Sequence, residues 1–185
     1  PPGGQSGAAI SAASADGARE ARSRLRTRRG ALALGLLVAL AAAASLIAPW
    51  SSQLRIERAA SIWSTAPRAA YRQLEDAARL NPLSDEPYSL AGTIALRFGD
   101  LARADHEFAL ALKRNRDDAY PTLERGAIAS AEGRQAQARA LLERTVRLTP
   151  QDKLARDALK VVRGGRRLDI ESINRVILFK AQQIA

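Results

Sequence analysis

The sequence contains no cysteine and no methionine, and its only histidine is His106. Without cysteine the chain can form neither disulfides nor thiolate metal sites, and it has no cysteine nucleophile. A single histidine excludes a metal site built from several histidines and argues against a catalytic dyad at His106. Because a complete natural chain begins with methionine and this one begins with Pro1, we expect it to be part of a longer or processed protein.

Aromatic residues are also scarce, at 4% of the 185 residues, whereas hydrophobic residues make up 46% and charged residues 26%. A core must therefore be built mainly from alanine, leucine, valine and isoleucine. Alanine has the highest helix propensity, and its small side chain lets helices approach closely. No stretch of alternating polar and apolar residues indicates a β-sheet. We predict an all-α fold.

A net charge of +10 raises the question of nucleic-acid binding, but the charge is distributed unfavourably for that function. The net charge is +4 over residues 1–50, +2 over residues 51–150 and +4 over residues 151–185. A phosphate-binding groove needs its basic excess on the folded part of the chain. The nearly balanced centre therefore argues against a nucleic-acid partner.

The N-terminal third is predicted to contain a membrane tether. Residues 1–18 are mostly small or polar and should be disordered, and six arginines follow between Arg19 and Arg29. Residues 31–50 then carry no charge, and a helix of that length spans about 30 Å, the thickness of a bilayer's hydrocarbon core. We therefore expect residues 1–29 to be a disordered cytoplasmic linker with an arginine collar, and residues 30–50 to be a transmembrane helix that ends near Pro49 and Trp50.

Two other interpretations of residues 31–50 stay open, a buried alanine-rich helix of a soluble protein and a cleavable export signal. Against the first, this segment has no polar residue besides Ser45. Against the second, the basic region is unusually long. If the span is retained, the arginines before it place the linker in the cytoplasm and residues after 50 outside the cytoplasmic membrane. The excess of arginine over lysine hints at a bacterial source.

The central part of the chain shows an internal repeat of 34 residues. Several independent positions recur at this step. The recurring sets are Gly99 and Gly133, Pro87 and Pro121, Gly92 and Gly126, Asn81, Asn115 and Thr149, Ala70, Ala104 and Ala138, and Leu74, Phe108 and Leu142. Small residues are expected inside helix pairs, large ones between neighbouring units, and Gly99 and Gly133 in left-handed turns.

These residues resemble the tetratricopeptide repeat (TPR) family, whose 34-residue helix-turn-helix unit carries the pattern W-x2-L-G-x2-Y, A-x3-F and P. The best match is the second repeat, with Tyr88, Ala91, Gly92 and Ala95 followed by Ala104, Phe108 and Ala111. The resemblance implies a solenoid over residues 51–163 with about three repeats and a capping helix. The expected helices are 53–64, 67–80, 86–98, 101–114, 119–132, 135–148 and 152–163.

Residues 164–185 are predicted to form a C-terminal amphipathic helix or tail, because Ile170, Ile173 and Ile177 fall on one face at helical spacing. Three alternatives stay open for this segment. Its apolar face packs on the solenoid, this face meets a partner or the membrane surface with the help of nearby arginines, or the segment is disordered.

The family resemblance implies that a protein or peptide partner binds the concave face made by the first helix of each unit. The candidate binding residues are Arg55, Trp63, Glu86, Ser89, Thr93, Arg97, Tyr120 and Leu123. Tryptophan, tyrosine and arginine are the residue types that most often anchor interfaces, although Trp63 could equally be a core residue. The lysine and asparagine set with which one TPR subgroup grips acidic C-termini does not occur at these positions. Self-association into a homo-oligomer stays open.

No pattern typical of an active site, a metal site or a cofactor site is found. The acidic pairs at residues 75–76, 85–86 and 117–118 are better explained as helix caps or solvated side chains, since neighbours on a helix do not face one another. We therefore predict a membrane-anchored scaffold that is not an enzyme. An alternative is that the chain is the C-terminal accessory region of a polytopic O-antigen ligase-like glycan transferase, which the stretch 80–96 resembles and whose catalytic part is absent here.

Overall fold

The computed structural model describes residues 35–36 and 48–170. The predicted linker, nearly all of the predicted membrane helix and the C-terminal residues from 171 on lie outside the described residues. Within them, no helix is both long enough and apolar enough to cross a membrane. The chain divides into two units, Pro1–Ala48 and Pro49–Ala185, and the fold described below is that of the second unit.

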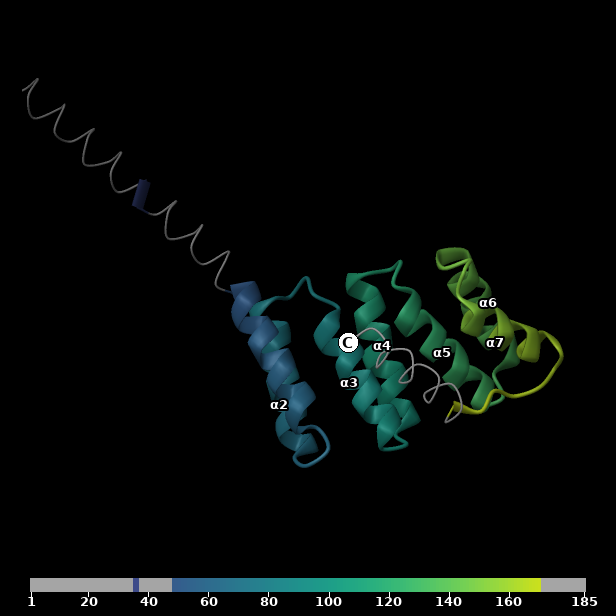
Figure 1. Cartoon of the computed structure of the whole chain (residues 1–185), viewed down its shortest axis with the longest axis horizontal. Helices are drawn as coiled ribbons and strands as arrows, with labels where there is room; N and C mark the ends of the chain where they lie inside the picture. Colours follow the sequence, from purple (N-terminus) through teal and green to yellow (C-terminus); the bar gives the residue numbers. More distant parts are fainter. Residues whose placement is uncertain (1–34, 37–47, 171–185) are drawn as a thin grey trace, which may run out of the picture. The chain divides into compact units, whose positions relative to one another are not determined.

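The second unit is a row of helices in which each helix packs against the next (Figure 1). The first helix of the row ends at residue 62. The others are α2 (Pro67–Leu80), α3 (Glu86–Arg97), α4 (Leu101–Arg114), α5 (Ala119–Ala131), α6 (Gln135–Leu148) and α7 (Lys153–Arg163). Over the described residues this arrangement confirms the predicted all-α helical solenoid.

The helix ends follow from local sequence signals. Asp100, Asp118 and Asp152 precede α4, α5 and α7, and each side chain accepts a hydrogen bond from a backbone N–H in the first turn. Gly99 and Gly133 have φ angles of 72° and 83°, the left-handed geometry that glycine adopts without strain. The predicted bounds of α2, α4 and α6 are those observed, and α3, α5 and α7 differ from prediction by one residue at one end.

The second and third repeats each close around one glycine and one large apolar residue. Phe108 and Leu142 lie on the second helix of their units, and their side chains are fully buried. A Cβ atom added at Gly92 would lie 2.7 Å from Cε1 of Phe108, and one at Gly126 would lie 3.0 Å from Cδ2 of Leu142. At Gly92 the two helices therefore approach too closely for a larger residue, whereas at Gly126 an added Cβ would require Leu142 to shift.

After α7 the chain turns back along the solenoid. Gly165, with a φ of 74°, makes the turn, and Arg167 reaches the glycine turn at Gly133. The buried backbone N–H of Leu168 then donates to Oγ of Ser130 at 3.0 Å. Ile170 packs against the core cluster formed by α3, α4 and α5. The first residues of the predicted tail thus pack on the solenoid, which was one of the three alternatives considered.

Candidate functional site

The predicted binding residues of α3 and α5 come together on one face, which we call the inner face. It consists of Ser89, Thr93 and Arg97 on α3 and of Tyr120, Leu123, Glu124 and Ala127 on α5. Their spacing of three and four residues places them on the same side of each helix. The hydroxyls of Thr93 and Tyr120 lie 2.7 Å apart and join the two helices across this face.

Accessibility differs strongly between the two helices. On α3, Ser89 and Thr93 are half-buried, Arg97 is exposed, and Glu86 is exposed at the start of the helix. On α5, Leu123 is only 4% exposed. Tyr120 is half-buried and stands edge-on to Phe108, with ring centroids 5.8 Å apart. The side chains that water reaches most easily are therefore those of α3.

Arg55 and Trp63, the other two predicted residues, have partners within the fold. The Arg55 guanidinium lies 3.1 Å from the Asp76 carboxylate and 3.2 Å from the Gln73 amide oxygen, both on α2. Trp63 packs on the apolar cluster of the first repeat and meets Phe98 edge-on at 6.2 Å. Core packing therefore accounts for Trp63, one of the two roles considered for it.

Sequence reasoning missed Glu124, which is fully buried on the inner face. Neither carboxylate oxygen has a hydrogen-bond partner. Burial raises the pKa of Glu124 from an ordinary 4.5 to about 7, and the positive charge of Arg97 opposes this only in part. Burial, followed by the nearby Glu124, also raises the pKa of Tyr120. An unpartnered buried carboxyl group is costly unless it is protonated or finds a partner.

The 34-residue register contains a signal that could have revealed Glu124. The equivalent positions in the two preceding units are Ile56 and Leu90. Ile56 is buried, and Leu90 packs against the same apolar cluster. A carboxyl group at a position that is apolar in both other repeats is the kind of local inconsistency that marks functional positions.

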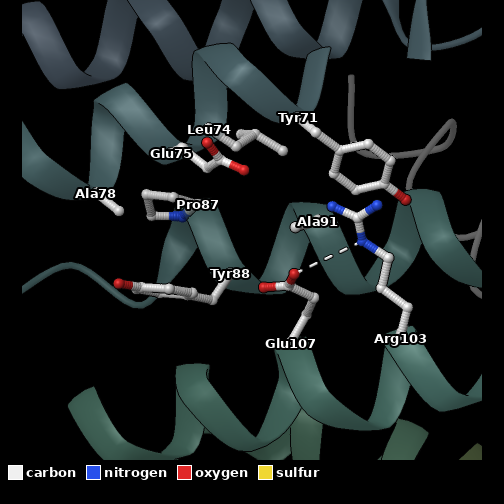
Figure 2. Close-up of a pocket in the computed structure, with 9 residues that line it drawn as sticks. All are labelled: Tyr71, Leu74, Glu75, Ala78, Pro87, Tyr88, Ala91, Arg103 and Glu107. Carbon is white, nitrogen blue, oxygen red and sulfur yellow. Dashed lines mark ion pairs between the residues drawn. The ribbon is translucent and has the colours of Figure 1, made fainter. Parts of the chain in front are cut away.

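A second candidate is a small pocket on α2, α3 and α4 (Figure 2). It is lined by Tyr71, Leu74, Glu75, Ala78, Pro87, Tyr88, Ala91, Arg103 and Glu107. The Arg103 guanidinium lies 3.4 Å from the centre of the Tyr71 ring and 3.7 Å from the Glu107 carboxylate. Burial raises the pKa of Glu107, and the neighbouring Arg103 and His106 partly oppose this shift.

This pocket holds about 40 Å³. Sites for drug-sized ligands occupy about 300–1,000 Å³. The surfaces of Tyr71 and Tyr88 are moreover already covered, by Arg103 and Arg114 respectively. The pocket therefore has room for a water-sized group, and its charged residues stabilise the packing of α2 against α4.

Other charged residues singled out in the sequence cap a helix, lie near an opposite charge or are exposed. Asp118 caps α5 through the backbone N–H of Tyr120, and burial raises its pKa. Asp117 lies 3.5 Å from Arg144. His106 is exposed on α4. Over residues 35–36 and 48–170, no three histidine, aspartate or glutamate side chains are grouped so that they could hold a metal ion.

No family model and no curated protein matches the sequence. Solved structures do match. The TPR domain of Arabidopsis OM64 has a TM-score of 0.57 and 20% identity, over 64% of this chain and 98% of that one. The first TPR of Spaghetti (RPAP3), bound to the HSP90 peptide SRMEEVD, has a TM-score of 0.58 and 18% identity, over 63% and 94%. MamA has a TM-score of 0.55 and 18% identity, over 71% of each chain.

These similarities confirm the predicted TPR fold. At 20% identity and below they are evidence of the fold alone. The comparisons do not support the resemblance to O-antigen ligase-like proteins.

Proposed function

We propose that the unit Pro49–Ala185 is an interaction module that holds a protein or peptide segment on the inner face of α3 and α5. The similarity to TPR domains supports this proposal, because one of those domains is described as bound to an HSP90 peptide. The observation that carries it is the buried Glu124 carboxyl group, which has no partner within the fold. A polar group left unpaired in this way gains a hydrogen bond when a partner supplies a donor.

The chemistry of the inner face defines the kind of partner. The buried atoms on it that lack a hydrogen-bond partner are oxygens, Oγ of Ser89 and both carboxylate oxygens of Glu124. Oxygens of a carboxylate accept hydrogen bonds, most strongly from lysine and arginine side chains. The partner segment should therefore carry a basic side chain. An acidic peptide such as SRMEEVD should bind poorly, since its carboxylates would approach Glu124.

Selection of displayed random peptides on the immobilised full chain, in detergent, tests this function. The selected peptides should be enriched in lysine and arginine. They should lose affinity at least about tenfold on Glu124→Gln, which keeps the size of the side chain and removes its charge. His106→Ala, on the exposed surface of α4, serves as the control and should bind all selected peptides as the wild type does. Peptides that bind all three proteins equally would show that the inner face is not the site.

We further propose that residues 31–50 tether this module to the cytoplasmic membrane of a bacterium, with the repeats on the outer side. The support is the uncharged run of twenty residues with arginines before it. Flotation with liposomes tests the tether. The full chain should float with the vesicles, whereas a chain lacking residues 31–47 should stay in the soluble fraction. Equal flotation of both would refute the tether.

Orientation is tested by adding protease to spheroplasts that produce the full chain. Residues after 50 should be degraded when the protease is outside, because the arginine collar should stay in the cytoplasm. Protection of the repeats would place them in the cytoplasm. No feature of the described residues favours the ligase-like alternative, and we do not propose it.

A further inference from the structure

The charge of the described solenoid is divided unevenly along the chain. Residues 48–133 carry eleven basic and twelve acidic side chains, which gives a net charge of −1. Residues 134–170, which include α6 and α7, carry ten basic and four acidic side chains, which gives a net charge of +6. The basic excess of the folded part therefore lies at the C-terminal end of the row of helices, the end opposite the first helix (Figure 1).

The outer face of α7 carries a row of basic side chains, which we call the basic stripe. Its members recur at intervals of three and four residues, so they share one side of the helix, and all are exposed: Lys153, Arg156, Lys160 and Arg163. The other side of α7 is apolar and packs on the core cluster that it shares with α5 and α6. At 1.5 Å per residue the stripe is about 15 Å long.

Most of the charge on the stripe is not neutralised. Of the ion pairs between described residues, the stripe takes part in one, from Arg163 to Glu143 at 2.9 Å. Glu143 also pairs with Arg139 of α6 at 3.1 Å, so these three side chains together keep a net charge of +1. Asp157 is the one acidic residue of α7. The stripe is therefore a positively charged surface that no other described element covers.

The C-terminal end of the solenoid offers charge without an apolar anchor. The exposed large hydrophobic side chains of the described residues all precede α4 in the chain: Leu36, Trp50, Leu54, Leu83 and Phe98. Protein interfaces depend on aromatic and other large anchors at their centre, and single-stranded nucleic acids are bound by stacking on aromatic rings. The stripe therefore fits a partner that presents dense negative charge and little else.

We propose that the outer face of α7 binds the anionic headgroups of a lipid membrane. Each basic side chain near such a surface adds to the attraction, and the exposed Arg166 and Arg167 after α7 enlarge the charged area. A membrane surface is flat and continuous, so a straight helix face can approach it along its whole length. The phosphates of a nucleic-acid duplex wind around an axis, so a straight row meets fewer of them. This contact requires neither the inner-face partner nor the predicted span.

A fluorescent label on α7 tests the contact, and the absence of native cysteine makes the labelling specific. The full chain with labelled Asp157→Cys is placed in vesicles of phosphatidylcholine, alone or with an equal amount of phosphatidylglycerol. Nitroxides on the lipid headgroups quench at short range, and they should quench this label only when the anionic lipid is present. A label at His106→Cys, exposed on α4, should be quenched in neither. Equal quenching of the α7 label in the two lipids would refute the proposal.

Charge reversal identifies the side chains responsible. In the labelled chain, Lys153→Glu combined with Lys160→Glu should lower the quenching to the level in phosphatidylcholine. Arg72→Glu combined with Lys113→Glu changes the net charge by the same amount at exposed positions of α2 and α4, and should leave the quenching unchanged. Equal loss in the two double variants would show that net charge, and not the stripe, attracts the membrane. Circular dichroism establishes that both are folded.

Salt and a competing polyanion test the nature of the attraction. At 1 M salt the Debye length falls to about 3 Å, so the quenching that depends on phosphatidylglycerol should disappear. Quenching that persists would indicate apolar insertion and contradict the proposal. Tight binding of a DNA duplex by the full chain, with no quenching in the anionic vesicles, would overturn the lipid contact in favour of nucleic acid.

The proposed tether and the α7 contact fail in different ways. Phosphatidylcholine has no net charge, so flotation with these vesicles tests the uncharged residues 31–50 alone. If the chain floats with them but the α7 label is not quenched in anionic vesicles, the tether stands and the α7 contact fails. If the chain floats only with anionic vesicles, and Lys153→Glu with Lys160→Glu prevents this, the α7 contact stands and the tether fails.

Discussion

The α3 and α5 helices occupy the same place in successive repeats, yet they differ in what their inner sides meet. Both carry a glycine against a large residue of the following helix, Gly92 against Phe108 and Gly126 against Leu142. On α3 the inner side is partly accessible and polar, whereas on α5 it is closed and contains Glu124. The repeat determines how helices pair, and contacts from outside the repeat determine which part of the shared face stays open.

The largest expected effect is on the packing of α3 against α4 and of α5 against α6. Phe108→Ala should lower the free energy of unfolding by about 4 kcal/mol and Leu142→Ala by about 3 kcal/mol, because each leaves a cavity in a closed core. Urea unfolding of the full chain, followed by circular dichroism, measures both. A larger loss for Leu142→Ala would mean that the α5–α6 pair, and not α3–α4, depends more on its central side chain.

The second prediction concerns the closed side of α5 and its response to pH. The folded chain holds the proton on Glu124 up to about pH 7, whereas the unfolded chain loses it near pH 4.5. The stabilisation is thus complete below about pH 4.5 and is lost as pH rises to 7, by roughly 3 kcal/mol at most. Thermal melts between pH 4.5 and 8 should show this fall.

Glu124→Gln isolates the contribution of this one carboxyl group. Burial also raises the pKa values of Glu107 and Asp118, so part of the wild-type pH dependence comes from these groups. The difference between the wild type and Glu124→Gln removes their contribution, and the variant should be the more stable protein at pH 8. Parallel pH profiles would show that Glu124 is hydrated and that α5 is as open as α3.

The third prediction compares the glycines. An alanine Cβ at position 92 would meet the Phe108 ring at 2.7 Å, closer than real contacts allow, so Gly92→Ala should cost about 1–2 kcal/mol. At position 126 the contact with Leu142 is 3.0 Å and the side chain is flexible. The helix propensity of alanine should offset most of the strain there, leaving about zero. The melting temperatures of the two variants test this prediction. Equal losses of stability in Gly92→Ala and Gly126→Ala would contradict it.

The last prediction concerns the hydrogen bond between Leu168 and Ser130 of α5. Ser130→Ala removes the acceptor for the buried N–H of Leu168 and should cost about 1 kcal/mol. It should also speed hydrogen exchange of the Leu168 amide, measured by NMR. Ser61→Ala, whose hydroxyl is exposed and bonds only the carbonyl of Arg58, is the control and should leave that exchange unchanged.

Features that repeat with the 34-residue step could be predicted from the sequence. The bounds of α2, α4 and α6 followed from the 34-residue repeat and its resemblance to the TPR unit, and the turns at Gly99 and Gly133 from the geometry that glycine allows. These features depend on contacts within a helix pair, and such contacts leave a periodic trace in the sequence. The prediction of a membrane helix over residues 30–50 stays a prediction, because those residues lie almost entirely outside the described part.

The candidate site was predicted less completely, because the burial of its residues depends on contacts that leave no periodic pattern in the sequence. The register indicated which residues of α3 and α5 share a face, but not that Arg55 pairs with Asp76 or that Trp63 packs near Phe98. The contact of Leu168 with Ser130 joins residues that are 38 apart and belong to no repeat. It has no local signal in the sequence.

The return of residues 168–170 to α5 also sets an order of events during synthesis. The ribosome makes these residues after α5, at about 5–20 residues per second, so Ser130 precedes Leu168 by roughly 2–8 s. Contacts within a helix pair involve near neighbours in the chain and form much faster than that. A nascent chain can therefore fold its α5–α6 pair while the inner side of α5 is still uncovered. During that interval a binding protein or chaperone meets α5 without competition from the chain's own later residues.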